Sequence, residues 1–332
     1  MAAVVLAAMA LLPRAAGTHL EGGRPGSELE MENPRNEDGK LRLLMCVTGQ
    51  LHRLELKSKL EHFVKAQTAE GHHVDVIAIM DSTDSPKSVN FKNDSAHNDA
   101  AVAFERAEQV VAAVSPLVHE MRFVNFSQAE SPEVPRWYAE GVNGKEYVTS
   151  DERVQMHVRQ FQTMEQCYDR MLDLEFDHGQ KYDEILRIRD DGYLMQPVKL
   201  LHTMSPVPDV AANDCDSWEG VNDKAILVRR SAAKAYFTNF LKALYLDRNL
   251  LSADVSRYKN PETLTYGVIK QANLTLAEDF DNLAVATLRT RMFEGVDECL
   301  ELCDAYKSCW ESKKASWSTL PPKCPHQEGR KC

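Results

Sequence analysis

The sequence has none of the short motifs that identify the common nucleotide-dependent and hydrolytic enzymes. It contains no Gly-x-Gly-x-x-Gly dinucleotide fingerprint, no P-loop, no His-Glu-x-x-His zinc motif and no Gly-x-Ser-x-Gly elbow. It is also poor in basic residues, since 39 lysines and arginines against 50 aspartates and glutamates give a formal net charge of -11. Dehydrogenases, kinases, zincins and α/β-hydrolases therefore lack support. No nucleic-acid partner is expected either, because no long basic stripe offsets the acidic excess.

The N-terminus lacks an apolar run long enough to cross a bilayer, which takes about twenty residues. Its apolar run extends only from Ala2 to Leu12, and the usual positive residues before such a run are missing. We interpret residues 1–17 as a signal peptide with a small-residue cleavage region at 15–17, as a truncated signal-anchor, or as an Ala-rich disordered start. Membrane association is expected, if at all, only through this N-terminus.

Cys-x-x-Cys pairs are absent, although the chain has eight cysteines. Five of them crowd the last 34 residues, as Cys299, Cys303, Cys309, Cys324 and Cys332. This crowding predicts a disulfide-stapled tail over residues 286–332, which needs an oxidising compartment. A zinc site is the competing interpretation, with only His326 nearby. The expected location is the secretory pathway, in the Golgi or ER lumen or outside the cell. Three Asn-x-Ser/Thr sequons are compatible with it but occur by chance at about this frequency.

Apolar strand-like runs and helical segments alternate between residues 40 and 285, after a polar stem at 18–39 that has Gly and Pro and little apolar content. Strands are expected at 41–47, 74–80, 121–126, near 184–189 and at 225–228. Helices are expected within 54–64, at 100–114 and 151–177, from Pro197 to His202, from an N-cap at Ser231, and at 260–270. Residues 128–149 are expected to be a long loop and 205–220 an irregular patch. The alternation predicts an α/β domain with a central, mostly parallel sheet flanked by helices.

Two adjacent aspartates follow the apolar run in residues 181–197, KYDEILRIRDDGYLMQP. One interpretation is a strand that ends in a solvated turn, since Asp-Gly is a common turn pair. The other is a metal and phosphate site, because open α/β sheets bind ligands at the carboxyl ends of their strands. Carboxylates are hard ligands suited to Mg²⁺ or Mn²⁺, and one or two are enough when a diphosphate completes the shell.

The strand pleat places Arg187 and Arg189 on the same face of this strand. Two guanidinium groups on a buried sheet need carboxylate or phosphate partners, because burying an unpaired charge is costly. A ligand site supplies such partners. Structural ion pairs with Asp183, Glu184 or an acid on a helix would also supply them.

Three segments, in this order, resemble poorly characterised eukaryotic glycosyltransferase-like proteins with the GT-A fold. They are Thr48-Gly49-Gln50-Leu51-His52-Arg53, the segment from Lys181 to Asp191, and Gly220-Val-Asn-Asp-Lys followed by Arg229-Arg-Ser-Ala-Ala. The similarity covers residues 40 to 275. It implies a GT-A-like (Rossmann-like) domain over residues 40–285 and a nucleotide-sugar-dependent transferase of the secretory pathway.

The resemblance also implies roles for individual residues. Nucleotide and donor binding would fall to Thr48, Gly49, Gln50, Arg53, Arg187, Arg189, Asp190 and Asn222. The divalent ion, Mn²⁺ or Mg²⁺, would bind Asp191 with Asp190 beside it, and Asp223 or Glu262 would be the catalytic base. The motif is Arg-Asp-Asp rather than Asp-x-Asp, which weakens the expectation of metal dependence. Asn222 and Asp223 are equally explained as a turn that caps the next strand.

The implied activity moves a sugar from a nucleotide-sugar donor to a glycan or glycoprotein acceptor, while the ion stabilises the leaving diphosphate as a Lewis acid. Inverting and retaining stereochemistry both stay open. The alternative is a secreted, non-catalytic carbohydrate-binding or adaptor protein on a transferase-like scaffold.

Overall fold

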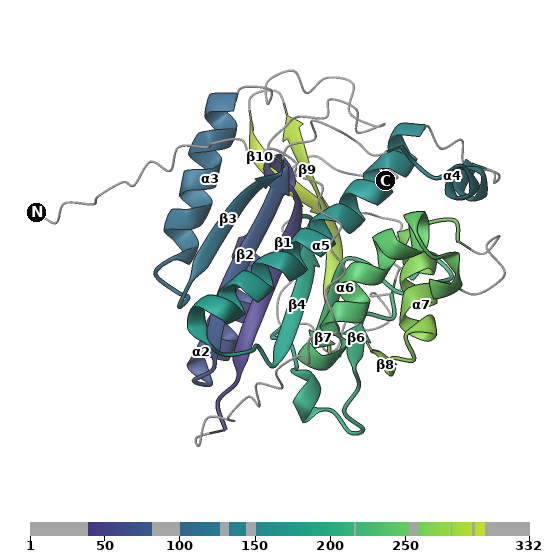
Figure 1. The fold of residues 1–332 in the computed structure, drawn as a ribbon. Helices are drawn as coiled ribbons and strands as arrows, with labels where there is room; N and C mark the ends of the chain where they lie inside the picture. The colour runs from purple at the N-terminus through teal and green to yellow at the C-terminus, as the bar shows by residue number, and fades with distance from the viewer. Residues whose placement is uncertain are drawn as a thin grey trace, which may run out of the picture. The chain divides into compact units, whose positions relative to one another are not determined.

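The apolar runs predicted as strands form the centre of the fold (Figure 1). A computed structural model describes residues 39–81, 100–126, 133–143, 151–215, 217–251, 258–279, 281–293 and 296–302, all of which belong to one compact unit of the chain, residues 33–332. The predicted signal segment, nearly all of the stem and the tail beyond residue 302 lie outside the described residues. Within the described part, no helix has the length and apolar content needed to cross a membrane.

Seven strands form the main sheet in the order β3-β2-β1-β4-β7-β6-β8. Their bounds are Met121–Phe126 (β3), His73–Asp81 (β2), Arg42–Gln50 (β1), Glu184–Arg189 (β4), Ala225–Arg229 (β7), Val210–Ala212 (β6) and Leu276–Glu278 (β8). Strands β1 to β4 are mutually parallel, and β6 is parallel to β8. Only β7 runs against its two neighbours. The predicted α/β class with a mostly parallel central sheet is therefore confirmed.

Helices cover both faces of this sheet. The long helix α5 (Asp151–His178) crosses β1 and β2, and α6 (Arg230–Tyr245) packs beside it (Figure 1). The remaining α- and π-helical segments are α1 (Lys57–Lys59), a π-helical turn (Leu60–Lys65), α2 (Ala66–Ala69), α3 (Ala100–Val114), α4 (Arg136–Asn143) and α7 (Pro261–Gln271). Alternate residues of β1 enter two different hydrophobic clusters, Leu44 with α5 and Leu43 with the helix after β1. Burial on both faces explains why the strands are almost continuously apolar.

Two of the predicted helices differ from the structure, because backbone hydrogen bonds to distant parts of the chain act at their starts. Residues 197–202 are not a helix; only Leu201–Thr203 form a single 3₁₀ turn. The backbone N–H of Val198 donates to His62 O instead, at 3.1 Å. Helix α6 begins at Arg230 rather than after a Ser231 cap, since the N–H of Arg230 donates to Asp183 O at 2.9 Å. Helix α7, by contrast, begins at the predicted Asn260 cap.

Other short elements lie in segments predicted to be irregular. Helix α4 lies inside the predicted loop 128–149, and the buried ring of Tyr138 anchors it in the core. Strand β6 lies inside the predicted irregular patch 205–220, and β1 continues through the predicted loop at 48–50. Tertiary packing decides these elements, because each is too short to form alone.

A second, antiparallel sheet has the order β10-β9-β5, with bounds Val296–Leu302, Val285–Phe293 and Gly192–Leu194. Strand β5 directly follows Asp190 and Asp191 and pairs with the start of β9. The predicted boundary between domain and tail at 285/286 therefore falls where β9 begins.

A disulfide joins Cys46 on β1 to Cys167 on α5, across 121 residues. It lies in the hydrophobic cluster between the sheet and α5. Cys215 is also disulfide-bonded. Of the five crowded cysteines, four lie beyond the described residues.

Candidate functional site

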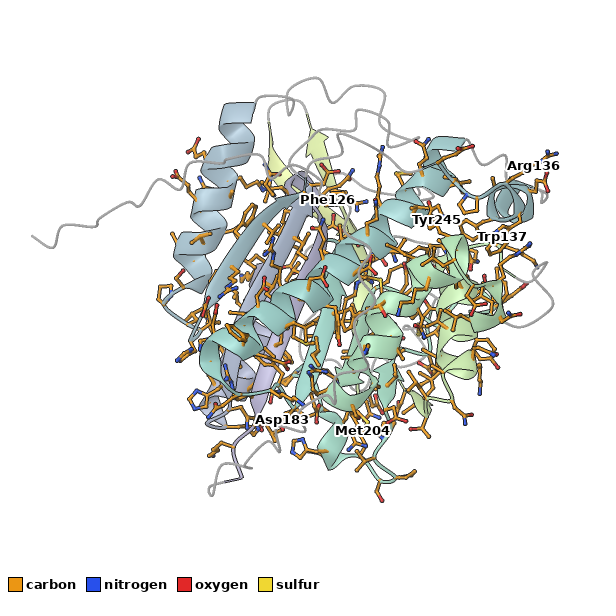
Figure 2. All side chains as sticks on the ribbon, viewed as in Figure 1. Phe126, Arg136, Trp137, Asp183, Met204 and Tyr245 are labelled. Carbon is orange, nitrogen blue, oxygen red and sulfur yellow. A yellow bond between two sulfur atoms is a disulfide. The ribbon has the colours of Figure 1, made fainter. Side chains whose placement is uncertain are left out.

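The strand order changes direction between β1 and β4. The chain passes from β1 to β2 and β3 on one side, and β4 then pairs with the other side of β1. Open α/β sheets bind ligands outside the carboxyl ends of their strands at such a switch point. In Figure 2, Phe126 at the end of β3 marks the edge with these carboxyl ends, and Asp183 before β4 marks the opposite edge.

Parts of all three segments that carry the family resemblance meet at this switch point, whereas Arg229 at the end of β7 pairs with Glu184 at the opposite edge. Thr48 near the end of β1 pairs with Arg189 at the end of β4, and Asp190 N–H donates to Thr48 O at 2.9 Å. Because β7 is antiparallel, its start lies at the same edge, where Arg189 N–H donates to Lys224 O at 2.8 Å. Segments more than 130 residues apart in the chain thus form one cluster, as Arg53 and Asp190 do across 137 residues.

Asp190 points toward the end of β1. Its Oδ2 accepts a hydrogen bond from the Gln50 backbone N–H and another from Arg53 Nε, both at 2.9 Å, while Arg53 Nη2 donates to Oδ1 at 3.2 Å. Gly49, with a φ of 140°, leaves the space that the Asp190 carboxyl group fills. The predicted Gly49, Gln50 and Arg53 therefore all contact Asp190.

Asp191 is held by two arginines. Arg189 Nε and Nη2 donate to its two oxygens at 3.0 and 2.9 Å, and Arg53 Nη1 lies 3.6 Å from Oδ2. Burial alone would raise the pKa of Asp191, but the charges of Arg189 and Arg53 lower it to about 2. Asp191 is therefore an anion at any physiological pH.

Asp223 and Glu262 share one lysine. Lys224 Nζ contacts Asp223 Oδ1 and lies 2.9 Å from Glu262 Oε1. Asp223 also accepts from Gln160 of α5 at 2.7 Å and pairs with Arg189 at 3.2 Å.

The two predicted bases differ in proton affinity. Burial opposes ionisation of Asp223, but Lys224 and the nearby arginines hold its pKa well below the ordinary value. For Glu262, burial and the Asp223 charge instead raise the pKa.

Arg187 is buried, with 1% of its surface exposed. It donates through Nη1 to the Asp223 backbone carbonyl, while Nε and Nη2 have no hydrogen-bond partner among the described residues. Burial lowers the pKa of its guanidinium group. The Thr48 hydroxyl is likewise buried without a hydrogen-bond partner in the described part of the chain.

Asn222 has a structural role in the observed contacts. Its side chain donates to Cys215 O and accepts from Lys224 N–H at 2.8 Å, and it is 1% exposed. These contacts fix the turn that brings Asp223 and Lys224 to the site. They agree with the alternative interpretation of Asn222, in which it belongs to a turn that caps the next strand.

Sequence reasoning missed three polar residues that complete the cluster: Lys59, Lys224 and Gln160. Lys59 is fully buried, and its ammonium donates to Asp190 O at 3.1 Å. Burial lowers the pKa of Lys59. The sequence could have indicated that Lys59 is buried. Lys59 falls three residues after Leu56 and four before Phe63, on the apolar face of the helical segment.

The carboxylate oxygens of this site suit a hard divalent metal ion, but each carboxylate already forms an ion pair with an arginine or lysine of the chain. Asp190 and Asp191 are bridged by Arg53, whose side chain is 32% exposed. An ion between these aspartates fits only where Arg53 moves away. Asp190 and Asp191 are then the residues that would hold it.

A surface groove lies at the opposite edge of the sheet, near Met204 in Figure 2. It is lined by Lys199, Thr203, Met204, Ser205, Pro206, Val207, Pro208, Thr275, Leu276, Ala277 and Asn282. Because the described residues of this lining include no acid, histidine or cysteine, the switch point is the better candidate for a functional site. No known family model matches the chain, and no curated protein was found to be similar to it.

Proposed function

We propose that this protein is a nucleotide-sugar-dependent glycosyltransferase with a GT-A-like domain. The observation that carries the proposal is the cluster at the switch point, where Asp190, Asp191 and Asp223 alternate with Arg53 and Arg189. Both parts of a metal-bound diphosphate have suitable partners there, carboxylates for the cation and guanidinium groups for the phosphates. The acceptor class is a glycan or glycoprotein.

The arginines would bind the anionic donor. Arg53 and Arg189 have 32% and 21% of their side chains exposed, so both can reach a ligand at the sheet edge. Negative charge builds on the diphosphate as the bond to the sugar breaks, and guanidinium groups stabilise that charge. Arg187 adds a buried positive charge behind them.

A divalent ion, Mn²⁺ or Mg²⁺, would be held by Asp190 and Asp191 after Arg53 has moved. When bound, such an ion supplies Lewis-acid stabilisation of the leaving diphosphate. The chain's own contribution is to keep the Asp191 carboxylate ionised. This follows from its pKa of about 2.

Glu262 is the better of the two predicted bases. A general base works best with a pKa near the working pH, and burial together with Asp223 moves the Glu262 pKa in that direction. Asp223, with its low pKa, is suited instead to holding Arg189 and Lys224. Gly220 permits this arrangement because a Cβ there would collide with the Glu262 backbone.

The buried disulfide supports a place in the secretory pathway, in the Golgi or ER lumen or outside the cell. Cys46 and Cys167 are both 0% exposed and lie in the core between the sheet and α5. Disulfides of this kind persist in oxidising compartments.

One observation favours a second candidate function, a secreted carbohydrate-binding or adaptor protein without turnover. Asp190, Asp191 and Asp223 are all ion-paired within the chain, as expected of a scaffold that no longer binds an ion.

A screen of nucleotide sugars for metal-dependent release of nucleoside diphosphate tests the proposal. We expect release with at least one donor in Mn²⁺, and its loss in Asp191→Asn. Asp173→Asn, an exposed acid on α5 paired with Arg170, is the matched control and should keep full activity. Absence of release with every donor, while the folded chain still binds glycans, would favour the non-catalytic alternative.

A further inference from the structure

A cluster of imidazole and carboxylate groups lies at the sheet edge opposite the switch point. Asp75 stands near the start of β2, His119 lies two residues before β3, and His178 is the last residue of α5. One potential ligand atom from each side chain lies within 4.8 Å of the other two. Strand β2 continues to Asp81, roughly 20 Å further along, so this cluster is separate from the proposed transferase site.

Asp75 is held so that one oxygen faces the histidines. Its Oδ2 accepts hydrogen bonds from the Tyr182 hydroxyl at 2.7 Å and from Arg42 Nη2 at 3.0 Å. Its Oδ1 accepts the Glu120 backbone N–H at 2.8 Å, which leaves a second lone pair on that oxygen. Outer contacts of this kind are what orient a carboxylate toward a metal.

The two imidazoles face acidic oxygens without hydrogen-bonding to them. His119 Nδ1 lies 3.7 Å from Asp75 Oδ1, which is too long for a hydrogen bond. His178 Nε2 is shielded from solvent and lies 3.0 Å from Glu120 Oε2, yet it has no hydrogen-bond partner among the described residues. The two rings are 5.2 Å apart. Asp75, His119 and His178 therefore converge with few bonds among themselves, and Glu120 lies next to His178.

We propose that Asp75, His119 and His178 bind a zinc ion, with Glu120 as the fourth ligand. Two imidazoles with carboxylates are a zinc-type donor set, whereas Mg²⁺ and Mn²⁺ prefer all-oxygen shells. Tetrahedral zinc needs its ligand atoms roughly 3.4 Å apart, so the cluster closes slightly on binding. His119 is free to make that movement because its side chain is 55% exposed.

The role of this zinc is structural. Asp75 and His119 belong to the β2–β3 edge and His178 to the end of α5, so the ion joins the helix to the sheet. Arg42 and Arg122 occupy the outer oxygens of Asp75 and Glu120, which leaves Asp75 Oδ1 and Glu120 Oε2 for the metal. The Cys46–Cys167 disulfide fixes α5 further along, and the zinc fixes its C-terminal end.

Zinc content and thermal stability test the site. The untagged full chain is stripped with a chelating resin, equilibrated with Zn²⁺ and analysed for bound metal. We expect one tightly held zinc ion per chain and a higher Tm with Zn²⁺ but not with Mg²⁺. His119→Ala and His178→Gln should each weaken zinc binding by more than about a hundredfold and abolish the Tm increase.

His202→Gln is the matched control, because His202 is also partly exposed and paired with a glutamate, Glu184, at 3.1 Å. It should bind zinc like the wild type. Circular dichroism confirms that each variant is folded before its zinc is measured, and His119 is exposed enough for its variant to fold. Equal zinc affinity in wild type and His119→Ala, or no tight zinc in the folded wild type, would overturn the proposal.

Discussion

The carboxyl group of Asp190 occupies the space that a side chain at Gly49 would need. A Cβ on Gly49 would lie 2.9 Å from Asp190 Cβ and closer still to the carboxyl carbon. Gly49 also has a φ of 140°, which L side chains rarely adopt. The absence of a side chain at Gly49 therefore permits Asp190 to reach the Gln50 N–H and Arg53.

Gly49→Ala should displace Asp190 and destabilise the fold. We expect the free energy of unfolding to fall by about 3 kcal/mol, from backbone strain and overpacking together, as measured by urea denaturation. Gly179→Ala is the control, since Gly179 also has a positive φ of 64° but no atom of the described residues within 4 Å of its Cβ position. That variant should cost only about 1 kcal/mol. Equal costs at the two positions would contradict a clash with Asp190.

Removing the Cys46–Cys167 disulfide should weaken the attachment of α5 to the sheet. The bond closes a long loop of the unfolded chain, so Cys46→Ala with Cys167→Ala should lower the free energy of unfolding by about 2–5 kcal/mol. Urea denaturation without reductant measures this. The single variant Cys167→Ala should expose one titratable thiol after denaturation. No new thiol there would mean that the two cysteines are not paired.

Asp191 should make stability depend on pH in a defined acidic window. Its folded pKa of about 2 lies below the ordinary value of 3.8, so the folded state binds the proton more weakly than the unfolded state. The resulting stability, about 2 kcal/mol, is present above pH 4 and is lost as the pH falls toward 2. In Asp191→Asn, the free energy of unfolding should therefore fall by about 2 kcal/mol less than in the wild type as the pH is lowered from 4 toward 2. The slope is the readout, because at every pH the variant also removes one of the two charged partners of Arg189, Asp191 and Asp223.

The fold class was predictable because strands buried on both faces need apolar residues at nearly every position. The meeting of the first two motifs has a related reason, because parallel strands bring their carboxyl ends to one edge, where Thr48 and Arg189 pair. The third motif reaches the same edge because β7 is antiparallel, which the sequence did not predict.

The partners of the acids were not predictable. Gln160 reaches Asp223 from α5, 63 residues away in sequence, and Lys59 reaches Asp190 across 131 residues. Such contacts depend on how a helix is rotated over the sheet, which the hydrophobic period fixes only coarsely. Strand β6 has three residues, and its pairing partners rather than its own sequence define it.

Arg53→Gln should strengthen binding of Mn²⁺ in the absence of nucleotide. Arg53 bridges Asp190 and Asp191, so its charge competes with a divalent ion for the same oxygens. Removing that charge should tighten Mn²⁺ binding by about tenfold or more, measured by calorimetry. Arg170→Gln changes net charge equally at an exposed pair on α5 and should have no effect. Unchanged or weaker Mn²⁺ binding in Arg53→Gln would argue that the ion does not replace Arg53.

Glu262→Gln should test the assignment of the base once a donor has been found. As a general base, Glu262 should lower kcat by about a hundredfold or more when replaced, with little change in donor binding. Glu219→Gln removes a nearby exposed glutamate paired with Lys259 and should keep its activity.

Burial and the Asp223 charge raise the Glu262 pKa, so the acid limb of the wild-type pH profile should lie above the ordinary glutamate value. Asp223→Asn removes one of those causes and should move the limb to lower pH. If the acid limb of the pH profile does not move in Asp223→Asn and is still present in Glu262→Gln, then the base is another residue.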